Sequence, residues 1–315
     1  YRRDLHRGFL QVRYLTTLRP GDQASVSQSN VAISIRSVAK CFTDSGGRSV
    51  RVLDGVSFDV YRGETMVIMG GSGCGKSTLL NCLIGEYAID EGEILYRTKA
   101  MDQPADIAAM TEEKLDELRK RFGILFQSGA LFNSMTVAEN VALPLKEHSY
   151  VDASIIDIVV TLKLQQVKML AHRDKTPSQL SGGQKKRAGL ARATALDPEI
   201  LFYDEPSAGL DPVTSAAIDE LMMDLSKKLQ VTSIVVTHEM DSAFRIADRM
   251  VMLDKGRVLK IGPRSDFEAM RDAEPGALTN HDERLLHQFL NGLSEGPLTD
   301  AEGLSEFEKL IIADG

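Results

Sequence analysis

Residues 70–78 read Gly-Gly-Ser-Gly-Cys-Gly-Lys-Ser-Thr and match the phosphate-binding P-loop pattern G-x-x-x-x-G-K-[ST]. A short apolar segment, 65–69, precedes the loop, and one apolar helix face follows it, which is the strand, loop and helix order that the pattern requires. Glycines let the backbone approach phosphates, and a helix N-terminus adds partial positive charge. We therefore expect a nucleoside triphosphate site contacted by Gly70, Ser72, Gly73, Cys74, Gly75, Lys76, Ser77 and Thr78.

Three side chains of this loop have separate expected roles. Lys76 is expected to reach the β- and γ-phosphates, and Ser77 to bind Mg²⁺. Cys74 lies where positive charge can lower the pKa of a thiol. We interpret Cys74 as a small structural residue that fills space and not as a redox switch.

Two later segments end in polar residues that suit phosphate chemistry. Residues 200–206, Ile-Leu-Phe-Tyr-Asp-Glu-Pro, read as an apolar strand that ends in two carboxylates, which is a Walker B pattern. Asp204 is expected to hold Mg²⁺ through water, and Glu205 to polarise the attacking water. His238 follows a second apolar strand, 233–236, and Leu-Ser-Gly-Gly-Gln at 180–184 precedes a helical run.

Together these motifs, in this order and spacing, resemble the ATP-binding subunit of ABC transporters over residues 31 to about 262. The resemblance implies an α/β P-loop NTPase fold with a helical subdomain and a small antiparallel β subdomain. It implies ATP and Mg²⁺ as ligands, and two ATP molecules held between two identical subunits. No sustained heptads separate Lys76 from Ser181 and no second P-loop follows, so the sequence does not resemble chromosome-maintenance ATPases or the fused ABC translation factors.

The same resemblance assigns roles to matching positions. Gln127 matches the Q-loop residue that senses Mg²⁺ and the γ-phosphate beside the membrane subunit, and His238 matches the switch histidine that contacts the γ-phosphate. Phe42 stands where the family stacks an aromatic ring on adenine. The remaining matches are the signature, which closes over the ATP of the other subunit, and the D-loop at the dimer interface: Ser181, Gly182, Gly183 and Asp211.

Simpler interpretations exist for some of these residues. Phe42 is equally consistent with ordinary core packing, and a lone histidine after a strand is usually a solvated or core residue. The basic run Lys185, Lys186 and Arg187 is typical of a solvated helix face rather than of a nucleic-acid site.

Composition and charge limit the class of protein. With 43% hydrophobic residues, 315 residues can bury one sizeable core, yet no run approaches the roughly 18 apolar residues of a membrane span. Cys41, Cys74 and Cys82 form neither a disulfide nor a zinc pattern. After residue 270 there are ten acidic and three basic side chains, so −7 of the formal net charge of −8 lies in this tail. The nearly neutral remainder predicts no nucleic-acid partner.

The chain divides into three predicted parts. Residues 1–28 form an Arg-rich extension, interpreted as a bacterial extension or, alternatively, as part of an organellar transit peptide. Residues 29–270 form the ATP-binding domain, with strands at 32–38 and 56–60, a hairpin turn near 44–47 and a helical subdomain at about 111–190. Residues 271–315 form the acidic C-terminal tail with amphipathic helices.

Two segments indicate a subfamily. Residues 125–132, Leu-Phe-Gln-Ser-Gly-Ala-Leu-Phe, together with 136–145, resemble the Mla-type ATPases of bacterial phospholipid traffic and of the related chloroplast lipid importer. Gln-Phe-Leu-Asn-Gly at 288–292 and the Gly-Pro at 296–297 resemble the tail of that subfamily. The resemblance implies phospholipid transport by a homodimer docked on a multi-pass permease, with a mammalian-cell-entry-type subunit and a small regulatory subunit. It places the protein on the cytoplasmic face of a bacterial inner membrane, or on the stromal side of a plastid envelope. The alternatives are a small-solute importer ATPase and a non-transport ABC ATPase.

The tail carries its own helix signals. Asn280 and Glu283 predict a capping box, and Gly292 predicts the end of the helix. An apolar stripe runs along this helix and must be covered, either by its own domain or by the second protomer or an accessory subunit. A second short amphipathic helix is expected within 298–315. The stripe comprises Leu285, Leu286, Phe289, Leu290 and Leu293.

Overall fold

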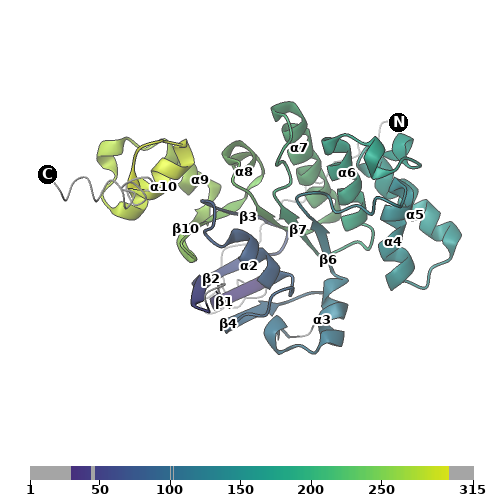
Figure 1. Cartoon of the computed structure of the whole chain (residues 1–315), viewed down its shortest axis with the longest axis horizontal. Coiled ribbons are helices and arrows are strands. Elements are labelled where there is room, and N and C mark those ends of the chain that lie inside the picture. Colours follow the sequence, from purple (N-terminus) through teal and green to yellow (C-terminus); the bar gives the residue numbers. More distant parts are fainter. Residues whose placement is uncertain (1–29, 44–46, 100, 102, 298–315) are drawn as a thin grey trace, which may run out of the picture.

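Two sheets and the helices around them make up the computed structural model, which describes residues 30–43, 47–99, 101 and 103–297 (Figure 1). The predicted α/β architecture with an antiparallel subdomain and a helical region is confirmed. The extension 1–28, the hairpin residues 44–46 and the helix expected within 298–315 lie outside the described residues.

The larger sheet has the strand order β10-β9-β3-β8-β7-β6, and all of its strands except β10 run parallel. Every residue of β3 and β8 is buried, as expected for parallel strands covered on both faces. The strands are β3 (Thr65–Gly70), β6 (Phe122–Leu125), β7 (Ile200–Asp204), β8 (Thr232–Val236), β9 (Arg249–Asp254) and β10 (Arg257–Pro263).

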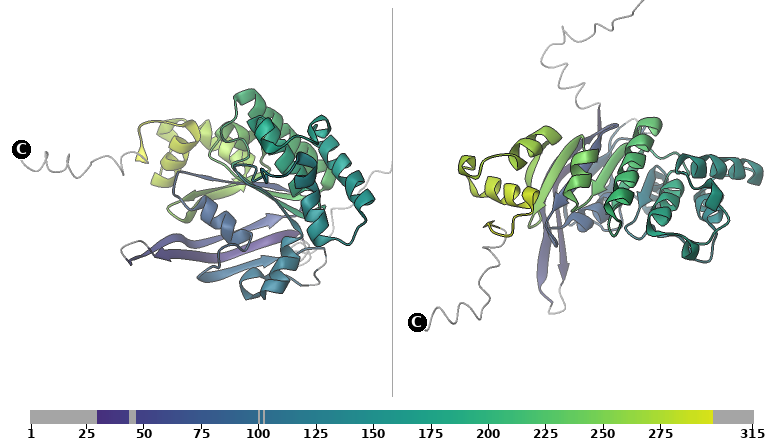
Figure 2. Two further views of the ribbon diagram at one scale, coloured as in Figure 1. Left: turned by 45° about the vertical axis from the view of Figure 1, so that its right-hand side comes forward. Right: turned by 90° about the horizontal axis from the view of Figure 1, so that it is seen from above.

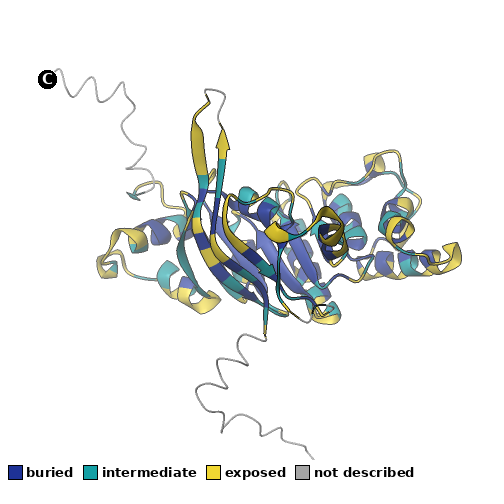
Figure 3. Ribbon diagram, turned by 90° about the horizontal axis from the view of Figure 1, so that it is seen from below, coloured by how far each residue is buried: buried dark blue, intermediate teal, exposed yellow. Residues whose placement is uncertain are grey.

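The smaller sheet is antiparallel, in the order β2-β1-β4-β5, and it contains both strands predicted at 32–38 and 56–60. Thr43 pairs with Ser49, so β1 and β2 form the expected hairpin, and the described residues nearest its turn, 42–43 and 49–50, are exposed (Figure 3). Helix α2 (Lys76–Leu83) shares one apolar core with both sheets (Figure 2). The strands are β1 (Val31–Thr43), β2 (Ser49–Tyr61), β4 (Glu91–Tyr96) and β5 (Ala105–Asp106).

The helical region begins later than predicted. Within the interval 111–190, α3 (Glu112–Arg119) buries Leu115 and Leu118 in the core that contains the antiparallel sheet, and β6 belongs to the central sheet. The prediction was wrong at this boundary because a short buried strand such as β6 has too few residues to show a period of its own. The helices that do form the region are α4 (Val137–His148), α5 (Ala153–Gln166), the 3₁₀ turns η2 (Leu170–His172) and η3 (Pro177–Gln179), and α6 (Gly182–Ala193).

The C-terminal helices lie at the opposite end of the molecule from α4 and α5 (Figure 1). The predicted capping box is confirmed, since the Glu283 N–H donates to Asn280 Oδ1 over 2.8 Å, and Gly292 ends the helix at a φ of 60°. The remaining elements are η1 (Ile107–Ala109), α7 (Pro212–Leu229), α8 (Met240–Ile246), α9 (Arg264–Arg271), η4 (Pro275–Ala277) and α10 (His281–Asn291).

The apolar stripe of α10 packs on its own chain. Leu285, Leu286 and Leu290 are buried in the same core cluster as Phe267 of α9. Of the two interpretations of the stripe, docking on its own domain is therefore the one observed, and coverage by a second protomer is wrong for these leucines. Leu293 stays 47% exposed.

Leu286→Ala is expected to lower the free energy of unfolding by about 2 to 5 kcal/mol, because it leaves a cavity beneath α10. Leu293→Ala, on the exposed continuation of the segment, should change it by no more than about 0.5 kcal/mol. Denaturant melts at several protein concentrations measure both values. An equal effect of the two variants, or a Leu286→Ala effect that appears only when the protein dimerises, would contradict this packing.

Candidate active site

Four neighbouring parallel strands deliver the predicted site residues to one edge of the sheet. β3 runs into the loop 70–75, β8 ends two residues before His238, and β7 ends at Asp204. β6 ends two residues before Gln127. Because β3, β8, β7 and β6 are adjacent and parallel, their carboxyl ends meet at one edge, where open α/β sheets bind ligands.

The loop 70–75 needs glycine at two positions for distinct reasons. A Cβ on Gly70, whose φ is +148°, would lie 2.3 Å from the Leu253 carbonyl oxygen. A Cβ on Gly75, whose φ is +105°, would lie 2.8 Å from a Leu53 methyl group. Gly75 also begins α2 without a side chain that could cap its first turn. The N–H groups of that turn are thus left to a ligand, which fits a phosphate.

The Lys76 ammonium lies over this loop. Its Nζ donates to the carbonyl oxygens of Gly70 at 2.8 Å and Gly71 at 2.9 Å, and the residue is 9% exposed. The loop therefore gathers a cation, a helix N-terminus and closely approachable backbone, which is the donor set that a triphosphate requires. Ser72, Gly73 and Ser77 are exposed at the same place and Thr78 is half-buried.

The Cys74 side chain fills space inside the loop, in agreement with its interpretation from the sequence. It is buried, its Sγ occupies the space that a Cβ on Gly70 would enter, and burial raises the pKa of its thiol. A raised pKa leaves little thiolate at neutral pH, so reactivity is not favoured.

The two carboxylates after β7 have different surroundings. Burial, and then the charge of Glu205, raise the pKa of Asp204, while Lys186 and Lys76 act in the opposite direction. Glu205 Oε1 lies 2.9 Å from His238 Nδ1, and the His238 N–H donates to Glu205 Oε2 over 3.4 Å. The Glu205 side chain is 12% exposed and that of His238 is 61% exposed. The structure therefore brings together the predicted base and the predicted switch histidine.

The residues available to bind a metal ion suit Mg²⁺, because they do not form a site in which protein side chains supply every ligand. Among residues 30–43, 47–99, 101 and 103–297, no group of three or more His, Cys, Asp or Glu side chains could hold a metal ion. Asp204 with the Ser77 hydroxyl offers one carboxylate and one neutral oxygen, and Gln127 is exposed beyond β6. Mg²⁺ typically takes one or two protein oxygens and completes its shell with water and substrate phosphates.

Phe42 is not part of the core. Its ring is 38% exposed at the end of β1 and makes an edge contact with Tyr87, with ring centroids 5.5 Å apart. Lys40 Nζ lies 5.4 Å from the Phe42 centroid. Ordinary core packing is thus wrong for Phe42, and its stacking on adenine stays a prediction.

The signature residues form the exposed start of α6. Ser181 caps the helix, since the Gln184 N–H donates to Ser181 Oγ over 3.3 Å and Gln184 Oε1 accepts from the Ser181 N–H at 3.0 Å. Ser181 and Gly182 are exposed, whereas Gly183 is buried, and a Cβ on it would lie 2.5 Å from Thr214. The first turn of α6 therefore presents its backbone outward.

The Asp211 side chain caps the N-terminus of helix α7. Its Oδ1 accepts from the N–H groups of Val213 at 3.1 Å and Thr214 at 3.0 Å, so it caps α7. Hydrogen bonds from Thr214 lower the pKa of Asp211. The predicted D-loop contact of Asp211 across a dimer interface stays a prediction, and it would use a carboxylate that already caps α7.

The burial of Lys186 and its contact with Glu205 were not expected from the sequence. We expected Lys185, Lys186 and Arg187 on a solvated face, but Lys186 is 4% exposed and its Nζ donates to the Glu205 carbonyl oxygen over 2.9 Å. The expectation was wrong for Lys186. A signal was present, because Gly183, Lys186 and Leu190 follow helical spacing along the buried face of α6.

The segment after Gln127 is anchored to α6 by another residue that the motifs did not reveal. Arg192 donates to the Ala130 carbonyl oxygen at 2.8 Å and to that of Gly129 at 3.2 Å. Ala130 has a φ of +47° and Gly129 a φ of +76°. Arg192 thus holds two left-handed residues directly after Gln127.

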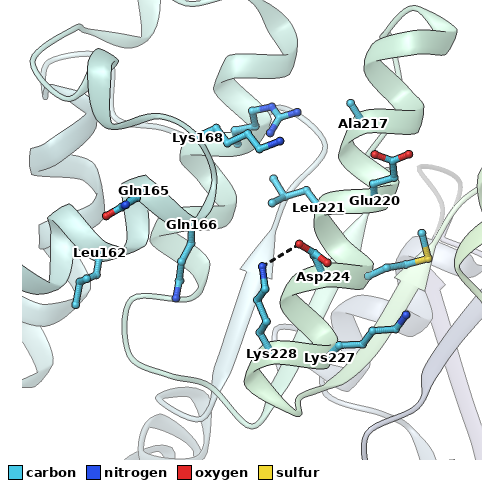
Figure 4. Close-up of a pocket in the computed structure, with 12 residues that line it drawn as sticks. Leu162, Gln165, Gln166, Lys168, Ala217, Glu220, Leu221, Asp224, Lys227 and Lys228 are labelled. Atoms are coloured by element: carbon cyan, nitrogen blue, oxygen red, sulfur yellow. Dashed lines mark hydrogen bonds and ion pairs between the residues drawn. The ribbon is translucent and has the colours of Figure 1, made fainter.

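A cavity of about 740 Å³ lies away from this edge, between the end of α5 and α7 (Figure 4). Its walls carry charges of both signs, and Asp224 and Lys228 pair across one helical turn at 2.9 Å. None of the phosphate-binding motifs contributes to it, so we do not assign the nucleotide to this cavity.

The fold and the site geometry define a P-loop nucleotide-hydrolysing domain. The profile of the ABC transporter family matches residues 53–208. A relative from Mycobacterium leprae, "Probable ribonucleotide transport ATP-binding protein mkl", is 39% identical over 88% of this chain and 72% of its own length. The "Intermembrane phospholipid transport system ATP-binding protein MlaF" of Escherichia coli K12 is 39% identical over 78% of this chain and 86% of its own length.

The chain belongs to the ABC transporter family, as its ATP-binding and ATP-hydrolysing component, with ATP and Mg²⁺ as ligands. Solved structures agree. A dimeric post-hydrolysis ATP-binding cassette, MJ0796 bound to ADP and Pi, matches with a TM-score of 0.66 and 29% identity over 74% of this chain and 98% of that one. The protein cbiO1 from Clostridium perfringens matches with a TM-score of 0.67 and 29% identity over 76% and 91%. In the described part of this chain, no helix has the length and apolarity to cross a bilayer.

Proposed function

We propose that this chain powers the movement of phospholipid between membranes. The observation that carries the proposal is the similarity to MlaF over 86% of the length of that protein. The mkl relatives, whose name refers to ribonucleotides, make ribonucleotide transport the second candidate.

The surface beside Gln127 supports docking on a membrane partner. Phe126 is 38% exposed and Phe132 is 50% exposed, so this segment presents two aromatic rings. Asn140, fully buried, fixes its far end by accepting from the Phe132 N–H at 2.8 Å and donating to the Phe132 carbonyl oxygen over 3.1 Å. Exposed aromatic residues on a rigid support are typical of protein interfaces.

In the proposed reaction, each residue acts on ATP at the sheet edge. Lys76 and the first turn of α2 would hold the phosphates, and Asp204, Ser77 and Gln127 would hold Mg²⁺, which would supply positive charge to offset the charge of the phosphates. Glu205 orients water toward the γ-phosphate, and His238 contacts the γ-phosphate as well as the Glu205 carboxylate. Ser181 with the following glycines contacts the ATP of a second copy of this chain. The structural relative MJ0796 is a dimer in its post-hydrolysis state, which supports this shared arrangement.

The proposed assembly contains a homodimer of this chain, a multi-pass permease and a mammalian-cell-entry-type lipid-binding subunit. A small regulatory subunit is a further proposed member, and nucleic acid is not. The chain would lie peripherally on the cytoplasmic face of a bacterial inner membrane, or on the stromal side of a plastid envelope.

Purification of the intact complex through a tag on this chain tests the proposal. Lipid extraction followed by mass spectrometry should find phospholipid bound to the co-purified membrane subunits. ATP hydrolysis by the reconstituted complex should then drive transfer of labelled phospholipid between vesicle populations, with the Glu205→Gln complex as the inactive control. Transfer of ribonucleotide with no movement of lipid would favour the second candidate, and co-purified nucleic acid without a permease would reject transport altogether.

A further inference from the structure

A buried lysine of α6 contacts the turn that carries the predicted base. Lys186 is 4% exposed, and its Nζ donates to the Glu205 carbonyl oxygen at 2.9 Å. Burying an ammonium group is costly unless it is hydrogen-bonded and near negative charge. The placement of Lys186 at this turn therefore calls for a specific explanation.

The backbone at Glu205 is strained. Its φ is +46°, in the left-handed region that side-chain-bearing residues rarely adopt and that persists only where the surroundings impose it. The Glu205 N–H donates to the Val236 carbonyl oxygen of β8 over 2.9 Å, and the Glu205 carbonyl accepts from Lys186 of α6 at 2.9 Å and, more weakly, from the Ala208 N–H of its own turn at 3.3 Å. Residue 205 is thus held at its N–H by the sheet and at its carbonyl by the signature helix.

Negative charge surrounds the same ammonium. Burial lowers the pKa of Lys186, while the carboxylates of Asp204, Glu205 and Glu239 favour its charged form. The neighbouring basic side chains of α6 do not share this environment. Lys185 is half-buried, and Arg187 donates to the Val167 carbonyl oxygen, just after α5, at 3.4 Å.

We propose that Lys186 is a positioning residue for ATP hydrolysis. By holding the Glu205 carbonyl, it keeps residue 205 in the left-handed conformation that directs the carboxylate to His238 and to the attacking water. Lys186 itself touches neither ATP nor that water. The proposal requires hydrolysis at this edge and does not depend on which solute is transported, so the two can fail separately.

Steady-state ATP hydrolysis by three purified full-length variants tests it. Lys186→Met keeps the length of the buried chain but removes the donor, and we expect kcat to fall about 10- to 100-fold, as for a misplaced reacting group. The KM for ATP should stay within about threefold, because the phosphate contacts are untouched. Lys186→Arg should recover most of kcat. Lys185→Met, which removes the same charge one position away, should stay within about twofold of the wild type.

A double-mutant comparison separates positioning from general destabilisation. In a Glu205→Gln background the carboxylate to be positioned is gone, so adding Lys186→Met should slow single-turnover hydrolysis by less than about threefold. If Lys186→Met cannot be purified folded, Lys186→Gln serves in the same comparisons. An unchanged kcat in the Lys186 variant would overturn the proposal. So would a loss that Lys186→Arg does not recover, or a loss that multiplies fully with that of Glu205→Gln.

Discussion

Glu205→Gln is expected to bind ATP normally and to hydrolyse it at least about 100 times more slowly than the wild type, within the range for losing a positioned base. The amide keeps the size of the side chain and its contact with His238, which is 2.9 Å from the carboxylate. What it loses is the negative charge that polarises the attacking water. The loss should therefore appear in kcat and not in nucleotide affinity.

Equilibrium binding of a fluorescent ATP analogue and phosphate release by the same preparation measure the two effects. Lys76→Ala provides the contrast, because it deletes a charged phosphate contact and should weaken binding at least about tenfold. Near wild-type turnover by the Glu205 variant would show that another group activates the water.

Ser181→Arg is expected to abolish ATP-driven dimerisation while each monomer still binds ATP. Ser181 and Gly182 are exposed at the first turn of α6, where the predicted partner nucleotide would sit. An arginine there fills that space, removes the capping box with Gln184 and places positive charge at a helix N-terminus. The monomer should lose only about 1 kcal/mol of stability, because the capped turn is at the surface.

Light scattering in a Glu205→Gln background, with and without ATP, measures the association. Ser178→Arg, a neighbouring exposed serine in η3, is the matched control and should dimerise. Mixing Ser181→Arg with Lys76→Ala should allow at most one complete site in each heterodimer. Stable ATP-dependent homodimers of the Ser181 variant would refute a site shared between two copies.

The grouping of the predicted site residues at one edge of the sheet could be expected from the sequence, because each motif is local in sequence. The loop 70–78, the pair Asp204 and Glu205, and His238 each follow an apolar strand, and parallel strands end at a common edge. Pattern and spacing therefore indicated, from the sequence alone, that these residues lie at the same edge of the sheet. The capping box at Asn280 was predictable for the same reason, since its two members are three residues apart.

The features that could not be predicted depend on contacts between residues far apart in the sequence. Lys186 looks like one of three surface basic residues until the Glu205 carbonyl is placed opposite it. The stripe of α10 must be covered, but only tertiary packing decides that Phe267 lies beneath it. The start of the helical region was misplaced because β6 has four residues, and its neighbour β7 comes from far along the chain.

Helix α6 connects the signature, the turn at Glu205 and the segment after Gln127. Ser181 lies at its start, Lys186 donates to the Glu205 carbonyl and Arg192 donates to the carbonyls of the residues after Gln127, so one helix segment about 16 Å long joins the exposed signature end to two anchored contacts. If docking at the Gln127 segment changes the affinity of the Ser181 end for nucleotide by some factor, nucleotide must change the affinity for the docked protein by that same factor. Titrating either ligand in the presence and in the absence of the other would therefore yield the free energy that couples the membrane partner to ATP.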